Sequence, residues 1–141
     1  MIGGMERPAR IHHVALRVAD PERALRFYSG VLGLDEARRF EEGGRVRSIW
    51  LSVGDAVVML EREIKGSSAS ARKGSSAAAR KGAGAQAGSG HVLVFAVSDL
   101  AAWESRLAAA GVAIADRTAA TLYVVDPDGH RVGLSVFPLR G

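Results

Sequence analysis

The sequence predicts an α+β fold made of two βαβββ modules, residues 11–64 and 91–138. The first half opens "HVALRVADPERALRFYSGVLGL", and "VLVFAVSDLAAWESRLAAAGV" repeats this pattern 79 residues later, so that Val18 and Asp20 match Val97 and Asp99. A stretch at 66–90, "GSSASARKGSSAAARKGAGAQAGSG", separates the halves and repeats eight residues nearly unchanged. Gly, Ala and Ser bury too little apolar surface to offset chain entropy, so residues 65–90 are predicted to be a flexible linker that interrupts one domain.

Each module is expected to begin with a strand and a helix. Asp20 and Asp99 each follow an apolar strand and are suited to cap the helix that comes next, while Pro21 fits the first turn of the first helix. The first helix should bury an apolar stripe of Ala24, Leu25, Tyr28, Val31 and Leu32. In the second helix the corresponding stripe is Leu100, Trp103, Leu107 and Ala110, with Trp103 in the core.

Three further strands are expected in each module, separated by turn residues. In the first module they are Asp35–Glu41, Val46–Val53 and Ala56–Glu63, with turns at "EEGG" and "GD". In the second they are Val112–Arg117, Thr121–Val125 and Arg131–Phe137, with "DPDG" turning between the last two. Pro127 and Gly129 supply the dihedral angles of that turn.

Composition limits the partners that the chain is expected to have. The net charge of +4 arises within 66–90, where Arg72, Lys73, Arg80 and Lys81 have no acidic neighbour, so the remainder is net neutral and no nucleic-acid partner is expected. No apolar run approaches the length of a membrane span, so no membrane partner is expected. The absence of cysteine excludes disulfides and thiolate metal sites, and it favours a cytoplasmic location.

The paired βαβββ modules, together with "DPDGHRVGLSVF" near the end, resemble the vicinal oxygen chelate superfamily. That superfamily includes glyoxalase I, extradiol dioxygenases, fosfomycin-resistance enzymes and bleomycin-binding proteins. The resemblance implies that the two modules form a cup-shaped curved sheet, usually within a homodimer. It also implies that a metal ion, where one is used, sits in the cup.

Strand alternation indicates which side chains face this cup. Val14, Leu16 and Val18 share one face of the first strand and should pack on the helix, so His13 and Arg17 lie on the opposite face and His12 does not. The resemblance places His13 at the family's first metal-ligand position. In the second module the same alternation puts Val92, Val94 and Ala96 in the cup. His91 would then face away, unless a bulge shifts its direction.

The carboxylate ligands that the resemblance implies are missing. Met59 and Gly133 occupy the family's acidic positions, so the four expected ligand positions hold His13, Met59, Val92 and Gly133. One histidine is too few for a zinc, nickel or iron site, which needs about three protein ligands. Glu61 also faces the cup but lies two residues further along its strand. A looser metal site of His13, His91 and Glu61 remains as an alternative.

The alternation predicts a lining for the cup that suits a small molecule: His13, Arg17, Ser48, Trp50, Met59, Glu61, Tyr123, Arg131 and Ser135. Trp50 and Tyr123 are suited to stack on a planar ligand, and Arg17 or Arg131 to hold a carboxylate or phosphate. The alternative is that Trp50 and Tyr123 simply fill the space between the sheets.

The leading functional hypothesis is a glyoxalase/bleomycin-resistance-like, small-molecule-binding protein with a degraded metal site and no cofactor, which sequesters its ligand. The alternative is a metal-dependent lyase, isomerase or dioxygenase, with a divalent metal held by His13, His91 and Glu61. A third hypothesis is a metal-free enzyme in which Glu61 or His13 acts as general base.

Overall fold

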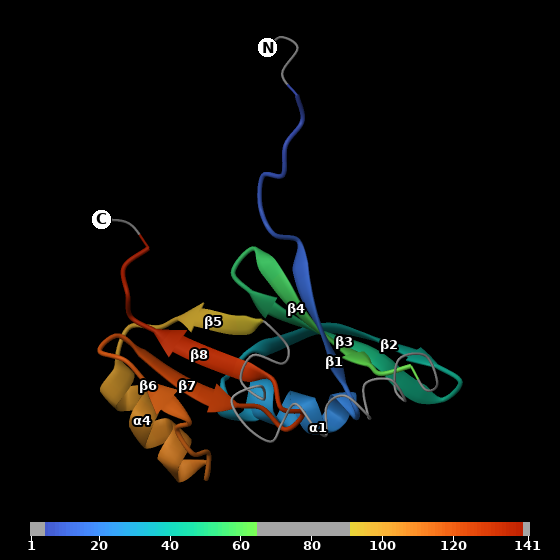
Figure 1. Ribbon diagram of the computed structural model, residues 1–141. Helices are drawn as coiled ribbons and strands as arrows, with labels where there is room; N and C mark the ends of the chain where they lie inside the picture. The colour runs from blue at the N-terminus through green and yellow to red at the C-terminus, as the bar shows by residue number, and fades with distance from the viewer. Residues whose placement is uncertain (1–4, 65–90, 140–141) are drawn as a thin grey trace, which may run out of the picture. The chain divides into compact units, whose positions relative to one another are not determined.

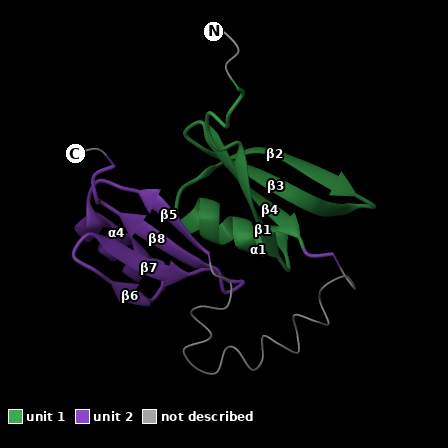
Figure 2. Ribbon diagram, turned by 45° about the horizontal axis from the view of Figure 1, so that its top comes forward, with its two compact units in different colours: residues 1–62 green, residues 63–141 purple. Residues whose placement is uncertain are grey.

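The computed structural model describes residues 5–64 and 91–139, and the predicted linker lies outside these ranges. The chain divides into two compact units, residues 1–62 and 63–141, which Figure 2 colours separately. Each unit carries one four-stranded sheet (Figure 1). None of the helices within the described ranges is long and apolar enough to cross a bilayer.

Both units have the βαβββ order that the sequence predicts. The elements of the first are β1 (His13–Val18), α1 (Pro21–Leu25), η1 (Arg26–Val31), β2 (Asp35–Glu42), β3 (Arg45–Val53) and β4 (Ala56–Arg62). Those of the second are β5 (Val92–Ala96), α4 (Leu100–Ala109), β6 (Asp116–Arg117), β7 (Thr121–Val125) and β8 (Arg131–Ser135). The strand orders, β1-β4-β3-β2 and β5-β8-β7-β6, are equivalent. In each sheet the strand that comes first in the chain, β1 or β5, pairs in parallel with the strand that comes last, β4 or β8.

The first helix begins as predicted but changes its winding. The Asp20 side chain accepts a hydrogen bond from the Glu22 backbone at 3.1 Å, and Pro21 follows directly. From Arg26 onward the helix has π geometry, and the Leu32 N–H donates to the Phe27 carbonyl five residues earlier. This wider winding changes which side chains face inward. Within the π segment Phe27 is buried and Val31, of the predicted stripe, is only half-buried; Leu25, at the end of α1, is also half-buried.

The second helix buries a narrower stripe than predicted. Asp99 caps it by accepting from the Ala102 N–H at 3.2 Å, and Leu107 is fully buried. Trp103, expected in the core, is only half-buried, and the Arg106 guanidinium lies over its ring at 4.5 Å. Ala110 is exposed because the helix ends at Ala109.

The strand faces that alternation assigns to the core are the buried ones. They hold Val18, Ile49, Leu51, Val58 and Leu60 in the first unit, and Leu122, Val124, Val132 and Leu134 in the second. Val14, Leu16 and Val53, which alternation assigns to the same faces, are only half-buried. Two expectations for the second unit are also wrong in detail. The strand predicted at 112–117 pairs only at Asp116–Arg117, and Val136, expected on the core face, is 36% exposed because β8 ends at Ser135.

Candidate functional site

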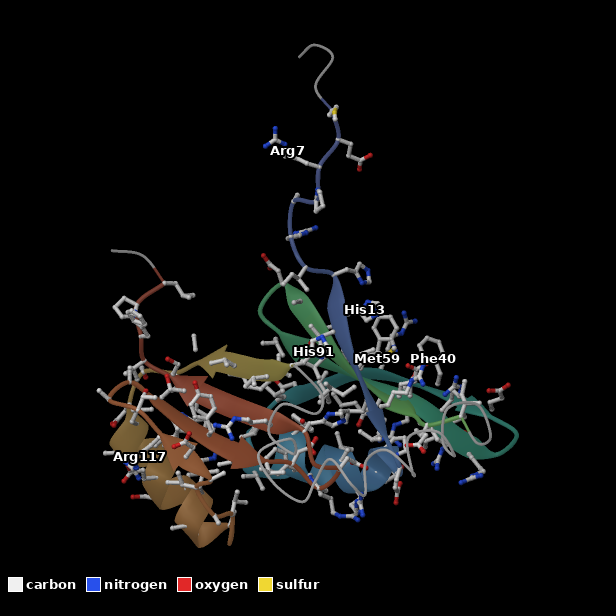
Figure 3. The ribbon with its side chains drawn as sticks, viewed as in Figure 1. Arg7, His13, Phe40, Met59, His91 and Arg117 are labelled. Carbon is white, nitrogen blue, oxygen red and sulfur yellow. The ribbon has the colours of Figure 1, made fainter. Side chains whose placement is uncertain are left out.

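The site residues predicted in the first module share one face of its sheet. The register of β1 and β4 sets His13 beside Val57 and Arg17 beside Glu61, while β3 sets Trp50 beside Met59. We call this surface the module-one face, and Figure 3 labels His13 and Met59 on it. The predicted residues on it are His13, Arg17, Ser48, Trp50, Met59 and Glu61, and Val57, the strand partner of His13, lies there too.

Aromatic rings gather at one part of the module-one face, around Trp50. The centroid of its ring lies 5.6 Å from that of His13, 6.5 Å from that of His12 and 6.0 Å from that of Phe40. Within the described ranges the buried indole N–H has no hydrogen-bond partner, so packing rather than a polar contact positions the ring. Phe40 was missed at the sequence level, although its pairing with Ser48 puts it on this face.

His12 belongs to this cluster, contrary to the expectation that it points away. Its Nδ1 lies 2.9 Å from Nδ1 of His13, a hydrogen bond in which one ring donates and the other accepts. The alternation rule fails for His12 because β1 begins only at His13, and a residue outside the strand is free of its two-residue period.

Glu61 shares the face with His13 but lies far along it. Val57 is the strand partner of His13, and Glu61 comes four residues later on β4, about 13 Å away at the usual rise per residue. Its carboxylate instead lies 3.6 Å from Nη2 of Arg47. Glu61 and His13 are therefore not brought together within the first module.

The predicted residues of the second module also share a sheet face, on which Arg131 and Ser135 already have polar partners. The Arg131 guanidinium lies over the Tyr123 ring at 4.5 Å, and Nη2 is 3.2 Å from a carboxylate oxygen of Asp116. Ser135 Oγ accepts from the Thr121 hydroxyl at 2.8 Å. Arg131, one of two arginines predicted to hold a ligand carboxylate or phosphate, is thus already paired with the carboxylate of Asp116.

The two positions of the second module to which the resemblance assigns metal ligands, Val92 and Gly133, carry no donor side chain. Val92 is an aliphatic residue that is 45% exposed. A Cβ atom built on Gly133 would lie 3.1 Å from Cε1 of Tyr123 and 3.1 Å from Cγ2 of Val94. The Tyr123 ring therefore packs against the position at which the family pattern carries glutamate. His91, on which the looser metal site depends, precedes β5 and is exposed.

Metal-binding geometry is not found elsewhere in the described parts of the chain. Across residues 5–64 and 91–139, no three His, Asp or Glu side chains are grouped closely enough to hold a metal ion. The four positions to which the resemblance assigns metal ligands hold His13, Met59, Val92 and Gly133, which together supply one imidazole and one thioether.

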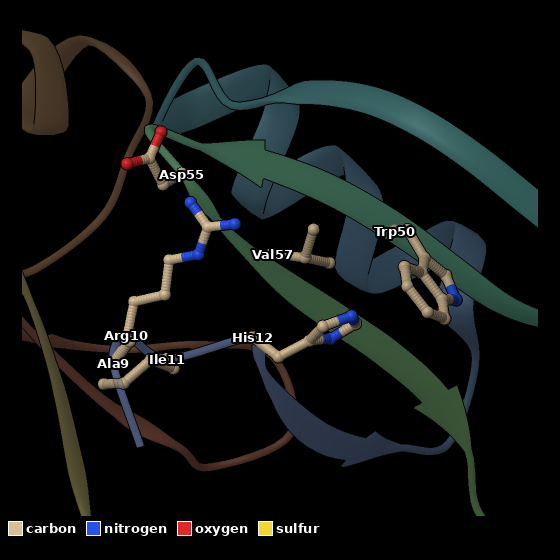
Figure 4. Close-up of a pocket in the computed structure, with 7 residues that line it drawn as sticks. All are labelled: Ala9, Arg10, Ile11, His12, Trp50, Asp55 and Val57. Carbon is tan, nitrogen blue, oxygen red and sulfur yellow. The ribbon is translucent and has the colours of Figure 1, made fainter. Parts of the chain in front are cut away.

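A pocket of about 490 Å³ opens beside the aromatic cluster, within the first unit (Figure 4). Trp50 and Val57 of the module-one face line it together with His12. Alternation did not predict the other lining residues, because they lie in the segment before β1 and in the turn between β3 and β4. The full lining is Ala9, Arg10, Ile11, His12, Trp50, Asp55 and Val57.

Comparison with known proteins identifies one family and many similar folds. The family model described as Glyoxalase/Bleomycin resistance protein/Dioxygenase superfamily matches residues 10–134. A search of curated proteins found no match.

Three solved structures illustrate the likeness. TnmS3, an antibiotic binding protein from Streptomyces sp. CB03234, is 19% identical with a TM-score of 0.63, over 93% of this chain and 98% of that one. The fosfomycin resistance protein FosX from Mesorhizobium loti is 20% identical with a TM-score of 0.63, over 99% and 95%. Lactoylglutathione lyase from Agrobacterium tumefaciens is 17% identical with a TM-score of 0.62, over 92% and 95%. At these identities the likeness establishes a shared fold.

Proposed function

This chain belongs to the Glyoxalase/Bleomycin resistance protein/Dioxygenase superfamily, and on that premise we propose that it binds a small organic molecule without a metal ion and acts by sequestering it. One fold in this superfamily hosts several chemistries, so the proposal depends on the site residues rather than on the fold.

The observation that carries the proposal is the set of side chains at the four family ligand positions. His13 offers a nitrogen and Met59 a thioether, while Val92 and Gly133 offer nothing. A borderline divalent ion needs about three nitrogen or oxygen ligands from the protein, and a thioether does not replace a carboxylate. Symmetry in a homodimer would only bring the same four residue types together again.

The rest of the module-one face supports ligand binding. Trp50, Phe40 and the two histidine rings form an aromatic surface next to a pocket, and such surfaces bind planar molecules. Among the similar structures, TnmS3 is described as an antibiotic binding protein. Sequestration needs no further chemistry, because a bound toxin is withdrawn from solution.

Metal analysis of protein purified without a histidine tag tests this proposal against the metal-dependent alternative. We expect far less than one transition-metal ion per chain, and the same content in His13→Ala. One zinc, nickel or iron ion per chain that disappears in His13→Ala would contradict the proposal. His130→Ala is the matched control, because His130 lies beside the "DPDG" turn and not at a family ligand position.

We further propose that residues 11–138 form one domain, interrupted at 65–90, and that the chain assembles as a homodimer. Both statements follow from the family premise. Sedimentation equilibrium of the full chain tests the assembly: a dimer mass is the expected result, and a monomer mass at high concentration contradicts it.

A further inference from the structure

The pocket beside Trp50 has features that specify a class of ligand more closely. Resting on the proposed function, we propose that it binds a planar aromatic monocarboxylate, with the aromatic rings against Trp50 and the carboxylate on Arg10. The lining comes from the first unit alone, from the segment before β1, from β3 and β4, and from the turn between them.

The aromatic part of the ligand is inferred from the shape and composition of the pocket. In Figure 4 the Val57 side chain lies between the Trp50 indole on one side and the Arg10 guanidinium on the other. Ala9 and Ile11 add apolar surface to the lining. A flat ring system resting on Val57 would contact the indole, and contacts between aromatic rings are favourable beyond the area that they bury. The volume of about 490 Å³ lies in the range of small-molecule sites.

The carboxylate is inferred from the unengaged cation. Arg10 is exposed, and within residues 5–64 and 91–139 its guanidinium makes no hydrogen bond or ion pair. The planar guanidinium matches a carboxylate with two parallel hydrogen bonds. His12 adds an imidazole to the lining of the pocket, and this ring is hydrogen-bonded to His13.

The restriction to one negative charge is inferred from Asp55. It is the one carboxylate of the lining, and Figure 4 shows it beyond the end of the Arg10 side chain. A second ligand carboxylate on that side would face Asp55 and be repelled, since like charges at close range disfavour binding. The pocket therefore discriminates monocarboxylates from dicarboxylates.

Calorimetry with 2-naphthoate as the probe tests the ligand class. We expect measurable binding to the full chain, at least ten-fold weaker binding of neutral 2-naphthamide, and weaker binding of 2,6-naphthalenedicarboxylate. Arg10→Ala should lower the affinity for 2-naphthoate at least ten-fold and change the affinity for 2-naphthamide by less than two-fold. Arg7→Ala is the matched control, because Arg7 belongs to the same segment but does not line the pocket (Figure 3).

The position of the bound probe is tested by fluorescence. The chain has two tryptophans, so Trp103→Phe leaves Trp50 as the sole indole. We expect 2-naphthoate to change the Trp50 emission of that variant with the affinity that calorimetry gives. Asp55→Asn should reduce the discrimination against the dicarboxylate, which a merely structural role for Asp55 would leave unchanged.

Three results would overturn the inference. The first is that Arg10→Ala and Arg7→Ala weaken 2-naphthoate binding equally. The second is that the chain binds 2-naphthoate and 2-naphthamide with equal affinity. The third is that 2-naphthoate does not bind. Each leaves the proposed sequestering function standing, because that function is tested independently by the metal content. One metal ion per chain that disappears in His13→Ala would contradict the proposed function. That result would not change the effect of Arg10→Ala on 2-naphthoate binding.

Discussion

Arg39 on β2 donates a hydrogen bond from Nη1 to the carboxylate of Glu22 on α1, at 2.8 Å, and so ties the helix to the edge strand of the first sheet. Its Nη2 donates to Glu36 at 2.9 Å. The hydrogen bond from Arg39 lowers the pKa of Glu36 below its ordinary value, and the two carboxylates raise the pKa of Arg39. These side chains are 31–45% exposed, so solvent screens the cluster.

Arg39→Met should therefore destabilise the protein by only about 0.5–1 kcal/mol at pH 7. Because the pKa of Glu36 is lower in the folded than in the unfolded state, this stability is present above the unfolded value near 4.5 and is lost as the pH falls through the folded value. Urea unfolding of the wild type and of Arg39→Met at pH 7 and pH 3 measures how the stability difference between them depends on pH. Arg38→Met is the control, since Arg38 stacks over Phe40 instead. A difference that persists unchanged at pH 3 would contradict the prediction.

Because Tyr123 lies close to Gly133, adding a Cβ atom at position 133 is expected to lower the stability of the fold. Alanine generally suits a strand better than glycine, yet its Cβ here would lie 3.1–3.2 Å from the ring. The ring is held by Arg131, which Asp116 in turn anchors. Gly133→Ala should therefore destabilise by about 1 kcal/mol.

A double-mutant cycle with Tyr123→Val checks this explanation. Removing the ring should at least halve the cost of Gly133→Ala, because only the Val94 contact remains. Equal costs in the two backgrounds, measured by thermal unfolding, would show that the ring does not restrict position 133.

Asp126 organises the "DPDG" turn and is 4% exposed. Its Oδ1 accepts from the backbone N–H groups of Asp128 and His130, both at 2.8 Å. Asp126→Ala leaves these donors without that acceptor and should cost about 2–3 kcal/mol, whereas Asp126→Asn keeps one acceptor oxygen and should cost less. The denaturant midpoints of the two variants show which loses more stability, and an equal loss of stability in both would contradict the prediction.

The two helix caps offer a test of the internal repeat. Asp20 and Asp99 each accept a hydrogen bond from the first turn of a helix, at 3.1 and 3.2 Å. Replacing either by alanine should cost about 1 kcal/mol, and replacing either by serine much less. Thermal unfolding of the four variants compares the sites. A cap that alanine leaves unaffected would show that the repeated aspartate does not support its helix.

Much of the fold follows from local patterns in the chain. The repeat of Val18 and Asp20 at Val97 and Asp99 predicts two equivalent modules, and the core faces follow from alternation within the strands. The alternation works because side chains of a paired strand point to opposite faces in turn. It fails where pairing stops, as at His12 and Val136, and where the helix winding changes, as at Phe27.

The side-chain contacts at the candidate site do not follow from local sequence patterns. Alternation grouped His13, Trp50 and Met59 correctly on one face, but gave no sign of how side chains pair within or beyond it. Asp116 neutralises Arg131 from a two-residue strand, and Arg47 approaches Glu61. Such contacts depend on side-chain conformations and on strand register, which a pattern of apolar residues does not encode.

The sequence by itself determined the two βαβββ modules and most of their buried faces, because both depend on residue type and local period. Only the tertiary structure decided that His12 joins His13 and Trp50, that Tyr123 packs over Gly133, and that Arg10 lines a pocket with Asp55. Those relationships join side chains of different strands, turns and chain segments, and only the folded chain sets the distances between them.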